Sequence, residues 1–337
     1  MRMTISTRNP VTPLPPEGPV PDTASSADKV GTIDQIAADI GREFEQRRIE
    51  ALDKSAKYRL WAFLGTAAAG GLLLVLWLIF RFDFDLVVFG TIGAASLGFY
   101  QARKPARQYR NSVKDEAFPR FVKTFGPSFQ YRRTGHLPMD FLKRSQLIPG
   151  HDERHFEDLI SGTWESVPFQ LCEAKLVDVR GAGKNRRRVT VFKGVFATFH
   201  LPSRVRSRTI IRRDMGAIGN WFGKAFSNLD RVSLEDPVFE KEFEVYGDDQ
   251  VASRTLLTTT FMERLRALAQ DIGNGKLQAA FYEEQLLVMI PCNKNRFEPT
   301  LSMEPNTARR DLEQFAADMK DILRVAERLK LGDNLGL

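Results

Sequence analysis

The sequence predicts an α+β protein in which a two-helix transmembrane hairpin precedes a cytosolic mixed sheet domain with a long C-terminal helix. Three observations predict this fold: two apolar runs flank the short segment RFDFD (81–85), strand patterns dominate residues 156–213, and residues 307–331 repeat apolar positions at helical spacing. Charged residues make up 27% of the 337 residues and are spread along the chain, while 43% apolar content suffices for an ordinary core.

The two apolar runs have the lengths of membrane spans. Leu60 to Phe80 contains no charged residue and matches the roughly 20 residues that cross the hydrocarbon, whereas Leu86 to Ala102, at about 17 residues, is at the lower limit. Small residues allow two helices to approach closely in lipid, and they recur at every fourth position. The positions predicted to pack are Gly65, Ala69, Gly90, Ala94 and Gly98. A Gly/Ala-rich soluble hairpin is the alternative.

Basic residues flank the two runs and predict their orientation. Lys54, Lys57 and Arg59 precede the first run, and Arg103, Lys104, Arg107 and Arg110 follow the second. The segment between the runs balances Arg81 with two aspartates. By the positive-inside rule, both ends of the hairpin face the cytosol. A cleaved signal peptide is not expected, because the first apolar run is too long for one and follows a polar segment.

The residues before the first run divide into two parts. Residues 1–30 are rich in Pro, Thr and Ser and predict a disordered cytosolic tail. Residues 31–58 predict a helix, because Thr32 and Gln35 form a capping-box signature before a narrow apolar stripe. The stripe consists of Ile33, Ala37, Ile40 and Phe44. It suits a short coiled coil, a membrane-surface helix or a helix packed on the main domain, and the pattern leaves these three open.

Residues 103–331 predict one cytosolic domain, followed by a short tail at 332–337. Residues 186–202 predict a long strand with apolar residues on both faces, in which Lys193-Gly194 indicates a bulge or bend. The alternating Glu240, Glu242 and Glu244 predict another strand with one wet face. Two helices at 248–257 and 259–271, a hairpin at 277–290 and the final helix at 307–331 complete the domain. Asn306 and Gly332 stand where the caps of that helix belong.

Several segments resemble a known family. They are FEDLISGTWESVPFQLCEAKL (156–176), FKGVFATFHLP (192–202), VSLEDPVFEKEFEVYGDDQVASRTLLTTTFMERL (232–265) and FEPTL (297–301). From about Phe121 to Leu331 the chain resembles the bacterial membrane-anchored family catalogued as domain of unknown function 3137 (DUF3137). The resemblance implies a multi-pass protein of the bacterial inner (cytoplasmic) membrane and implies no catalytic residue. At fold level, the domain also resembles a pleckstrin-homology-like barrel with a helical insertion.

The segment GAGKNRRR (181–188) predicts an exposed basic hairpin tip. It lacks the glycine spacing of a phosphate-binding P-loop, which also needs Ser or Thr after the lysine. We expect it to contact anionic lipid or a partner, at about 1 kcal/mol for each basic side chain near a membrane surface. The contact residues are Lys184, Arg186, Arg187, Arg188, Arg204 and Arg206. A solvated turn is the alternative, and the absence of a recognition motif or aromatic platform argues against nucleic acid.

Three of the four histidines lie close together in the sequence. His136, His151 and His155, with a nearby carboxylate, are residue types that hold zinc or iron, although they do not form an H-E-x-x-H motif. A solvated polar loop is the alternative. The two cysteines, Cys172 and Cys292, are far apart and predict neither a disulfide nor a zinc site. No cofactor is indicated.

The formal charge of +7 and the predicted anchor together favour a protein that acts at a membrane surface. We expect binding or assembly, with membrane lipids and either a second copy of the chain or another membrane protein as partners, and no nucleic acid. The alternative function is a membrane-surface metal-dependent enzyme that uses the histidine cluster.

Overall fold

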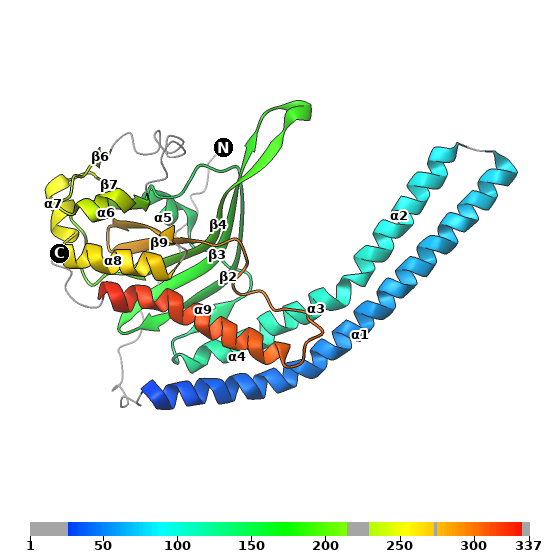
Figure 1. Cartoon of the computed structure of the whole chain (residues 1–337), viewed down its shortest axis with the longest axis horizontal. Coiled ribbons are helices and arrows are strands. Elements are labelled where there is room, and N and C mark those ends of the chain that lie inside the picture. The colour runs from blue at the N-terminus through cyan, green and yellow to red at the C-terminus, as the bar shows by residue number, and fades with distance from the viewer. Residues whose placement is uncertain (1–25, 82, 214–228, 273–274, 332–337) are drawn as a thin grey trace, which may run out of the picture.

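A computed structural model describes residues 26–81, 83–213, 229–272 and 275–331, with side chains from Ile33 onward. The predicted tails, 1–30 and 332–337, therefore lie outside the described residues except for 26–30, which already belong to a helix. The structure is α+β, with long N-terminal helices, an antiparallel sheet and a C-terminal helix packed on that sheet (Figure 1).

The first helix, α1, runs without a break from Ser26 to Phe80 and joins the predicted amphipathic helix to the first apolar run. α2 (Phe84–Ala102) returns beside it (Figure 1). Among the helices described, α1 is the one both long enough and apolar enough to cross a membrane. Large apolar side chains on the distal parts of both helices are exposed, including Trp61, Phe80 and Phe89 at about 70%. Exposed apolar surface on this scale is typical of a lipid or protein contact.

Small residues line part of the contact between α1 and α2. A methyl group added at Gly98 would lie 2.8 Å from the Ala62 Cβ, and one at Gly90 would lie 2.8 Å from the Leu73 Cδ1. Ala69 and Ala94 are half-buried in the same region. Gly65 does not take part as predicted, because an added methyl group there would meet nothing within 4 Å.

Short helical segments lead from α2 into the domain. They are α3 (Lys104–Ser112), the π-helical turn η1 (Val113–Ala117), α4 (Phe118–Phe121) and the 3-10 turn η2 (Val122–Thr124). Pro105 and Pro119 lie in the first turns of α3 and α4, where a missing backbone N–H costs little. These segments lie alongside α1 (Figure 1).

The described strands form one sheet. They are β1 (Gln130–Arg132), β2 (Glu153–Trp164), β3 (Val167–Arg180), β4 (Arg187–His200), β5 (Thr209–Arg213), β6 (Asp230–Arg231), β7 (Phe243–Gly247), β8 (Gln278–Tyr282) and β9 (Gln285–Pro291). Their order is β1-β2-β3-β4-β9-β8-β5-β7-β6, and all of these pairs are antiparallel, so the sheet is not mixed as predicted. Because this order is linear, a pleckstrin-homology-like barrel is not confirmed.

Both faces of the sheet are covered, as the long strand β4 predicted. Val195, Ala197 and Phe199 belong to the core beneath α9 (Thr307–Leu329), whereas Phe192 and Phe196 belong to a second core beside α5 (Met139–Arg144). Gly194 permits a close approach of β9, because an added Cβ would lie 2.1 Å from the Ile290 carbonyl oxygen. The two cores fix the sheet between layers of helices.

Helices α7 (Gln250–Leu256) and α8 (Thr259–Asp271) confirm two predicted elements. The acidic segment before them was predicted wrongly, because residues 237–242 form the helix α6 (Pro237–Glu242) and β7 begins only at Phe243. The Asp236 carboxylate accepts hydrogen bonds from the Val238 and Phe239 N–H groups, at 2.8 and 3.1 Å. This cap, together with proline at the first helical position, favours a helix here over the strand that the alternating glutamates predicted.

The apolar stripe of α1 packs on the main domain. Ile33, Ala37, Ile40 and Phe44 are all buried in the large core, which settles the three alternatives in favour of helix packing. α1 contacts α9, and a methyl group added at Gly41 would lie 2.8 Å from the Arg309 Cα. Glycine therefore allows the two helices to approach closely at this point.

Glu45 of α1 caps the N-terminus of α9. Its two carboxylate oxygens accept hydrogen bonds from the Asn306 and Ala308 N–H groups, at 2.9 and 3.3 Å, whereas the Asn306 side chain forms no capping bond. Arg48 lies 2.6 Å from Glu45 with its side chain only 3% exposed, and it also donates to the Ser302 carbonyl. At the far end, Lys330 adopts the left-handed cap conformation; the predicted Gly332 lies outside the described residues.

Replacing Glu45 by Ala should lower the stability of the domain. The change removes the acceptor of two α9 N–H groups and leaves the buried Arg48 without its carboxylate, at a cost of about 2 to 3 kcal/mol. Thermal unfolding of the full-length protein in detergent measures the effect. Glu43→Ala is the matched control, because its ion pairs with Arg47 and Arg120 are exposed and contribute at most about 1 kcal/mol. Equal melting temperatures for the two variants would contradict the capping role.

Candidate functional site

The structure separates the predicted basic residues into two groups. Residues 181–188 form the exposed tip of the β3–β4 hairpin, which stands out from the sheet (Figure 1). Arg188 pairs with Glu153 at its base. Arg204 and Arg206 are not part of this tip, because they follow the opposite end of β4, which spans on the order of 40 Å at about 3.3 Å per residue. Two basic groups that are close in the sequence thus lie far apart in the structure, because the whole length of β4 separates them.

The three predicted metal-binding histidines are not brought together. Nδ1 of His136 lies 3.0 Å from the Leu137 carbonyl, and Nδ1 of His151 lies 2.9 Å from the Pro149 carbonyl. His155 is exposed on β2. In the described part of the chain, the one group of His, Cys, Asp and Glu side chains close enough to share an ion contains none of these histidines.

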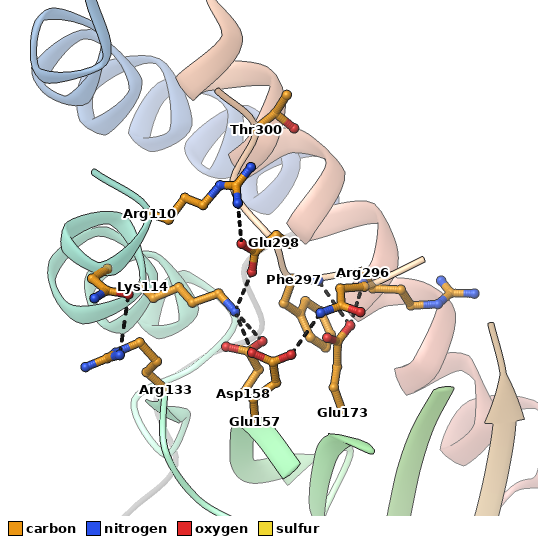
Figure 2. A network of polar contacts seen from close by, with 12 residues as sticks. Arg110, Lys114, Arg133, Glu157, Asp158, Glu173, Arg296, Phe297, Glu298 and Thr300 are labelled. Carbon is orange, nitrogen blue, oxygen red and sulfur yellow. Dashed lines mark hydrogen bonds and ion pairs between the residues drawn. The ribbon is translucent and has the colours of Figure 1, made fainter. Parts of the chain in front are cut away.

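That group consists of Glu157, Asp158 and Glu173, whose ligand atoms lie within 4.8 Å of one another. Lys114 of η1 already points a cation at it (Figure 2). Its Nζ lies 2.7 Å from Asp158, 3.3 Å from Glu157 and 2.9 Å from Glu298, with the lysine side chain only 4% exposed. Figure 2 shows Arg110 approaching Glu298 from the other side, at 3.5 Å. The ammonium group thus pairs with two of the three carboxylates that could otherwise share a metal ion.

Two irregular backbone segments bring Lys114 and Asp158 together. Lys114 lies on the π-helical turn, and Asp158 lies at a register shift of β2 with φ of 57°. π-turns and β-bulges both re-aim side chains and are frequent at functional sites. The Tyr131 hydroxyl donates to the second oxygen of Asp158, and the Asp158 N–H donates to the Arg133 carbonyl at 3.0 Å. Both oxygens of this fully buried carboxylate are therefore satisfied.

Glu173 has one satisfied oxygen and one free oxygen. The segment after β9 supplies the Arg296 N–H and, at 3.3 Å, the Phe297 N–H to one oxygen, as Figure 2 shows. The other oxygen is buried without a partner, although the residue is only 5% exposed. Asn295 from the same segment donates to Glu157 at 2.8 Å, and Arg296 pairs with Asp318 of α9 at 2.6 Å.

The electrostatics of the cluster favour a bound proton. Burial would lower the pKa of Lys114, but the charges of Asp158 and Glu298 outweigh it and raise the pKa above its usual value. Burial raises the pKa of Asp158 to about 6, although Lys114 opposes this. Burial and then the charge of Asp158 raise the pKa of Glu173 to about 7, against the lowering effect of the Arg296 and Phe297 N–H groups. Glu173 therefore gains or loses a proton near neutral pH.

Sequence reasoning missed this cluster. Lys114, Asp158 and Glu173 are far apart in the chain, and none of them belongs to a recognisable motif. One available signal was Glu173 itself, because it interrupts the apolar strand segment QLCEAKL, where a buried carboxylate needs a compensating group.

Residues 190–331 match the model of a family described as "Protein of unknown function (DUF3137)". The predicted resemblance to DUF3137 is confirmed over these residues, which make up less than half of the chain, while its bacterial and membrane-anchored parts stay predictions. The DUF3137 segment begins in β4 and contains Arg296, Glu298 and Asp318 of the site. Lys114, Asp158 and Glu173 lie before it, as do both apolar helices. The match is shorter than the predicted resemblance, which began near residue 121.

Two further comparisons add little to the DUF3137 match. No curated protein matches this chain in sequence. Among solved structures, the crystal structure of the mycobacterial trehalose monomycolate transport factor A, TtfA, is similar with a TM-score of 0.30 and 13% sequence identity. The alignment covers 61% of this chain and 96% of that chain. A similarity at this level supports no inference about the fold or function of the DUF3137 segment or of the residues before it.

Replacing Lys114 by Met should destabilise the protein strongly. The variant keeps the aliphatic stem but leaves Asp158, Glu157 and Glu298 without their shared cation, which typically costs about 3 to 5 kcal/mol. Thermal unfolding of the full-length protein at neutral pH measures this loss. Lys123→Met is the control, because Lys123 is exposed and forms none of the ion pairs found among the described residues. A melting temperature unchanged by Lys114→Met would show that the cluster is not held by this ammonium group.

Replacing Glu173 by Gln should change how stability depends on pH. Because burial raises the pKa of Glu173 from 4.5 to about 7, the folded protein binds the extra proton, and stability falls as the pH rises from about 4.5 to 7. Glutamine imitates the protonated acid, so the variant should nearly match the wild type at pH 5 and exceed it at pH 8 by on the order of 2 kcal/mol.

Unfolding curves at several pH values test this, with the exposed Glu263→Gln on α8 as control. The readout is the difference in stability between variant and wild type, in which the contributions of groups that do not interact with Glu173 cancel. A difference that does not grow with pH would contradict an elevated pKa of Glu173.

Proposed function

We propose that this protein is a membrane-anchored binding module. α1 and α2 cross a bacterial inner membrane with both termini in the cytosol, and they hold the domain against the bilayer, where its basic hairpin tip contacts anionic lipid. The observation that carries this proposal is the continuity of α1, which is docked on the domain at one end and exposes apolar side chains at the other.

The docking of α1 supports a two-span topology. The part of α1 around Ile40 and Phe44 packs on the core that includes α9, so the N-terminal half of α1 lies on the same side of any membrane as the domain. If the distal half of α1 crosses, the chain must return to reach α3 and the sheet. α2 is the segment placed to make that return, and its 19 residues are long enough to cross a locally thinned bilayer.

Charge distribution supports the same orientation. Arg103, Lys104 and Arg107, at the domain end of α2, are exposed, whereas the connection between α1 and α2 carries Arg81 with two aspartates. The positive-inside rule places the domain in the cytosol.

The β3–β4 hairpin supports a contact with lipid. Its tip carries Lys184, Arg186 and Arg187, all exposed, and it rises from the sheet toward the same side of the view as α1 and α2 (Figure 1). A tethered domain that presents such a tip gains about 1 kcal/mol per basic side chain at an anionic surface. Contact with lipid also explains why the strands extend well beyond the packed core.

Single cysteines test the anchoring in intact cells. In a Cys292→Ser background, Asp83→Cys lies in the connection between α1 and α2 and should react with a membrane-impermeant maleimide from outside. Glu263→Cys on α8 should react only after the cytosolic side is opened. Labelling of Glu263→Cys from outside would rule out this orientation. If Asp83→Cys also reacts only after the cytosolic side is opened, the two-span anchor is ruled out.

The same background tests the tip. The full-length protein with Lys184→Cys, carrying an environment-sensitive dye, is compared in nanodiscs of phosphatidylcholine with and without phosphatidylglycerol. We expect the dye to be protected from an aqueous quencher only with the anionic lipid, and less so at high salt or after Arg186→Ala and Arg187→Ala. A dye at Glu263→Cys serves as the control, and equal quenching at both sites in both lipids would refute the contact.

A further inference from the structure

A pocket of about 310 Å³ lies at the root of the β3–β4 hairpin, away from its tip. It is open to solvent and is formed by β2, β3, β4 and the segment that follows β9. The side chains that decide its chemistry are His155, Glu157, Glu173, Lys175, Lys193, Lys294 and Asn295. Its volume is at the lower end of the range for small-ligand sites.

Basic side chains lie next to one another across three strands of this pocket. In the register of the sheet, His155 is the direct partner of Lys175, and Lys175 is the direct partner of Lys193. Directly opposed like charges destabilise an antiparallel sheet. Because this row lowers the stability of the sheet and lies beside a pocket, its positive charge indicates a role in binding.

The lysines around the pocket lack acidic partners. None of the ion pairs between the described residues includes Lys175, Lys193 or Lys294. The ammonium group of Lys193 donates to the neutral Asn293 carbonyl, at 2.9 Å. Lys294 adds a third ammonium group from the segment after β9. The three ammonium groups outnumber the two carboxyl groups that line the pocket, and that of Glu157 is already paired with Lys114, so the pocket favours an anion.

Glu173 supplies an independent observation at the floor of the pocket. Its side chain lines the pocket. The residue is only 5% exposed, yet one of its carboxyl oxygens has no hydrogen-bond partner among the described residues. Because buried polar atoms are almost always satisfied, this oxygen points to a missing ligand group. When Glu173 is protonated, as its pKa of about 7 allows, the free oxygen can donate a hydrogen bond to an anion.

We propose that this pocket binds a phosphate group, carried either by a phospholipid headgroup or by a soluble phosphate. Lys175, Lys193 and Lys294 supply the positive charge, which lysine delivers to phosphate as a compact ammonium group. The neutral form of Glu173 and the side chain of Asn295 supply directed contacts at the floor. The residues are distinct from those of the hairpin tip, so this proposal and the tip contact can fail separately.

Isothermal titration of the full-length protein in a non-ionic detergent tests the proposal. The probes are inorganic phosphate and monomeric dihexanoyl phosphatidylglycerol, with sodium chloride at matched ionic strength as control. We expect one saturable site, and Lys175→Ala and Lys193→Ala should each weaken binding about fivefold, as expected for the loss of about 1 kcal/mol per basic group. Lys123→Ala, at an exposed lysine outside the pocket, should bind as the wild type does.

The melting temperature separates a binding role from a structural one. Without phosphate, Lys175→Ala should raise the melting temperature, because it relieves repulsion within the cationic row, and it should reduce the further stabilisation that phosphate provides. A lysine with a structural role would instead lower the melting temperature. Should Lys175→Ala fail to fold, Lys294→Ala outside the sheet gives the same test of affinity.

The outcomes distinguish the sources of the phosphate group. Saturable binding of both probes that depends on these lysines supports the site and indicates a soluble phosphate, whereas binding of the lipid alone indicates a headgroup. Absence of saturable binding, or binding unaffected by all three lysine variants, overturns the proposal. A loss of lipid protection at the tip with intact phosphate binding would overturn the tip contact and leave the pocket standing.

Discussion

The buried ammonium group of Lys114 is the interaction on which the arrangement of the molecule depends. It joins three segments that come from different parts of the chain: the π-helical turn after α3, the bulge of β2 at Asp158, and Glu298 in the segment that leads to α9. Burying one charge is costly, and only opposite charges close by can offset that cost. The irregular backbone at η1 and β2 is what places these groups within reach of one another.

A second constraint is the docking of α1 on α9. Glu45 and Arg48 of α1 bind the start of α9, while the stripe around Phe44 is buried in the core. α1 is one uninterrupted helix, so the orientation of its apolar half follows from this docking. The domain, the hairpin tip and the pocket beside Glu173 therefore keep a fixed direction relative to the apolar helices.

The positive charge of the chain has two structural locations with different chemistry. At the tip, Lys184 and its arginine neighbours are fully accessible and suit a diffuse anionic surface. In the pocket, Lys175 and Lys193 are aligned by strand register over a buried carboxyl group and suit a single small anion. Strand geometry produces this division. Side chains on one face of a strand repeat at every second position, so Glu173 and Lys175 lie on the same face, whereas the residues of the hairpin tip have no neighbouring strands.

The sequence by itself determined the elements whose burial pattern is local. The stripe from Ile33 to Phe44, the helix from Thr307 to Leu329, the β8–β9 hairpin and the apolar run of α1 all follow from side-chain periodicity. The short helix α6 could have been predicted from Asp236-Pro237, a local cap that the alternating glutamates concealed. Only the tertiary structure decided that Arg204 is remote from the tip, and that Lys114 meets Asp158 beside Glu173. Periodicity reports which face of an element is buried, whereas charge compensation depends on which distant segments pack together, and no local pattern records that pairing.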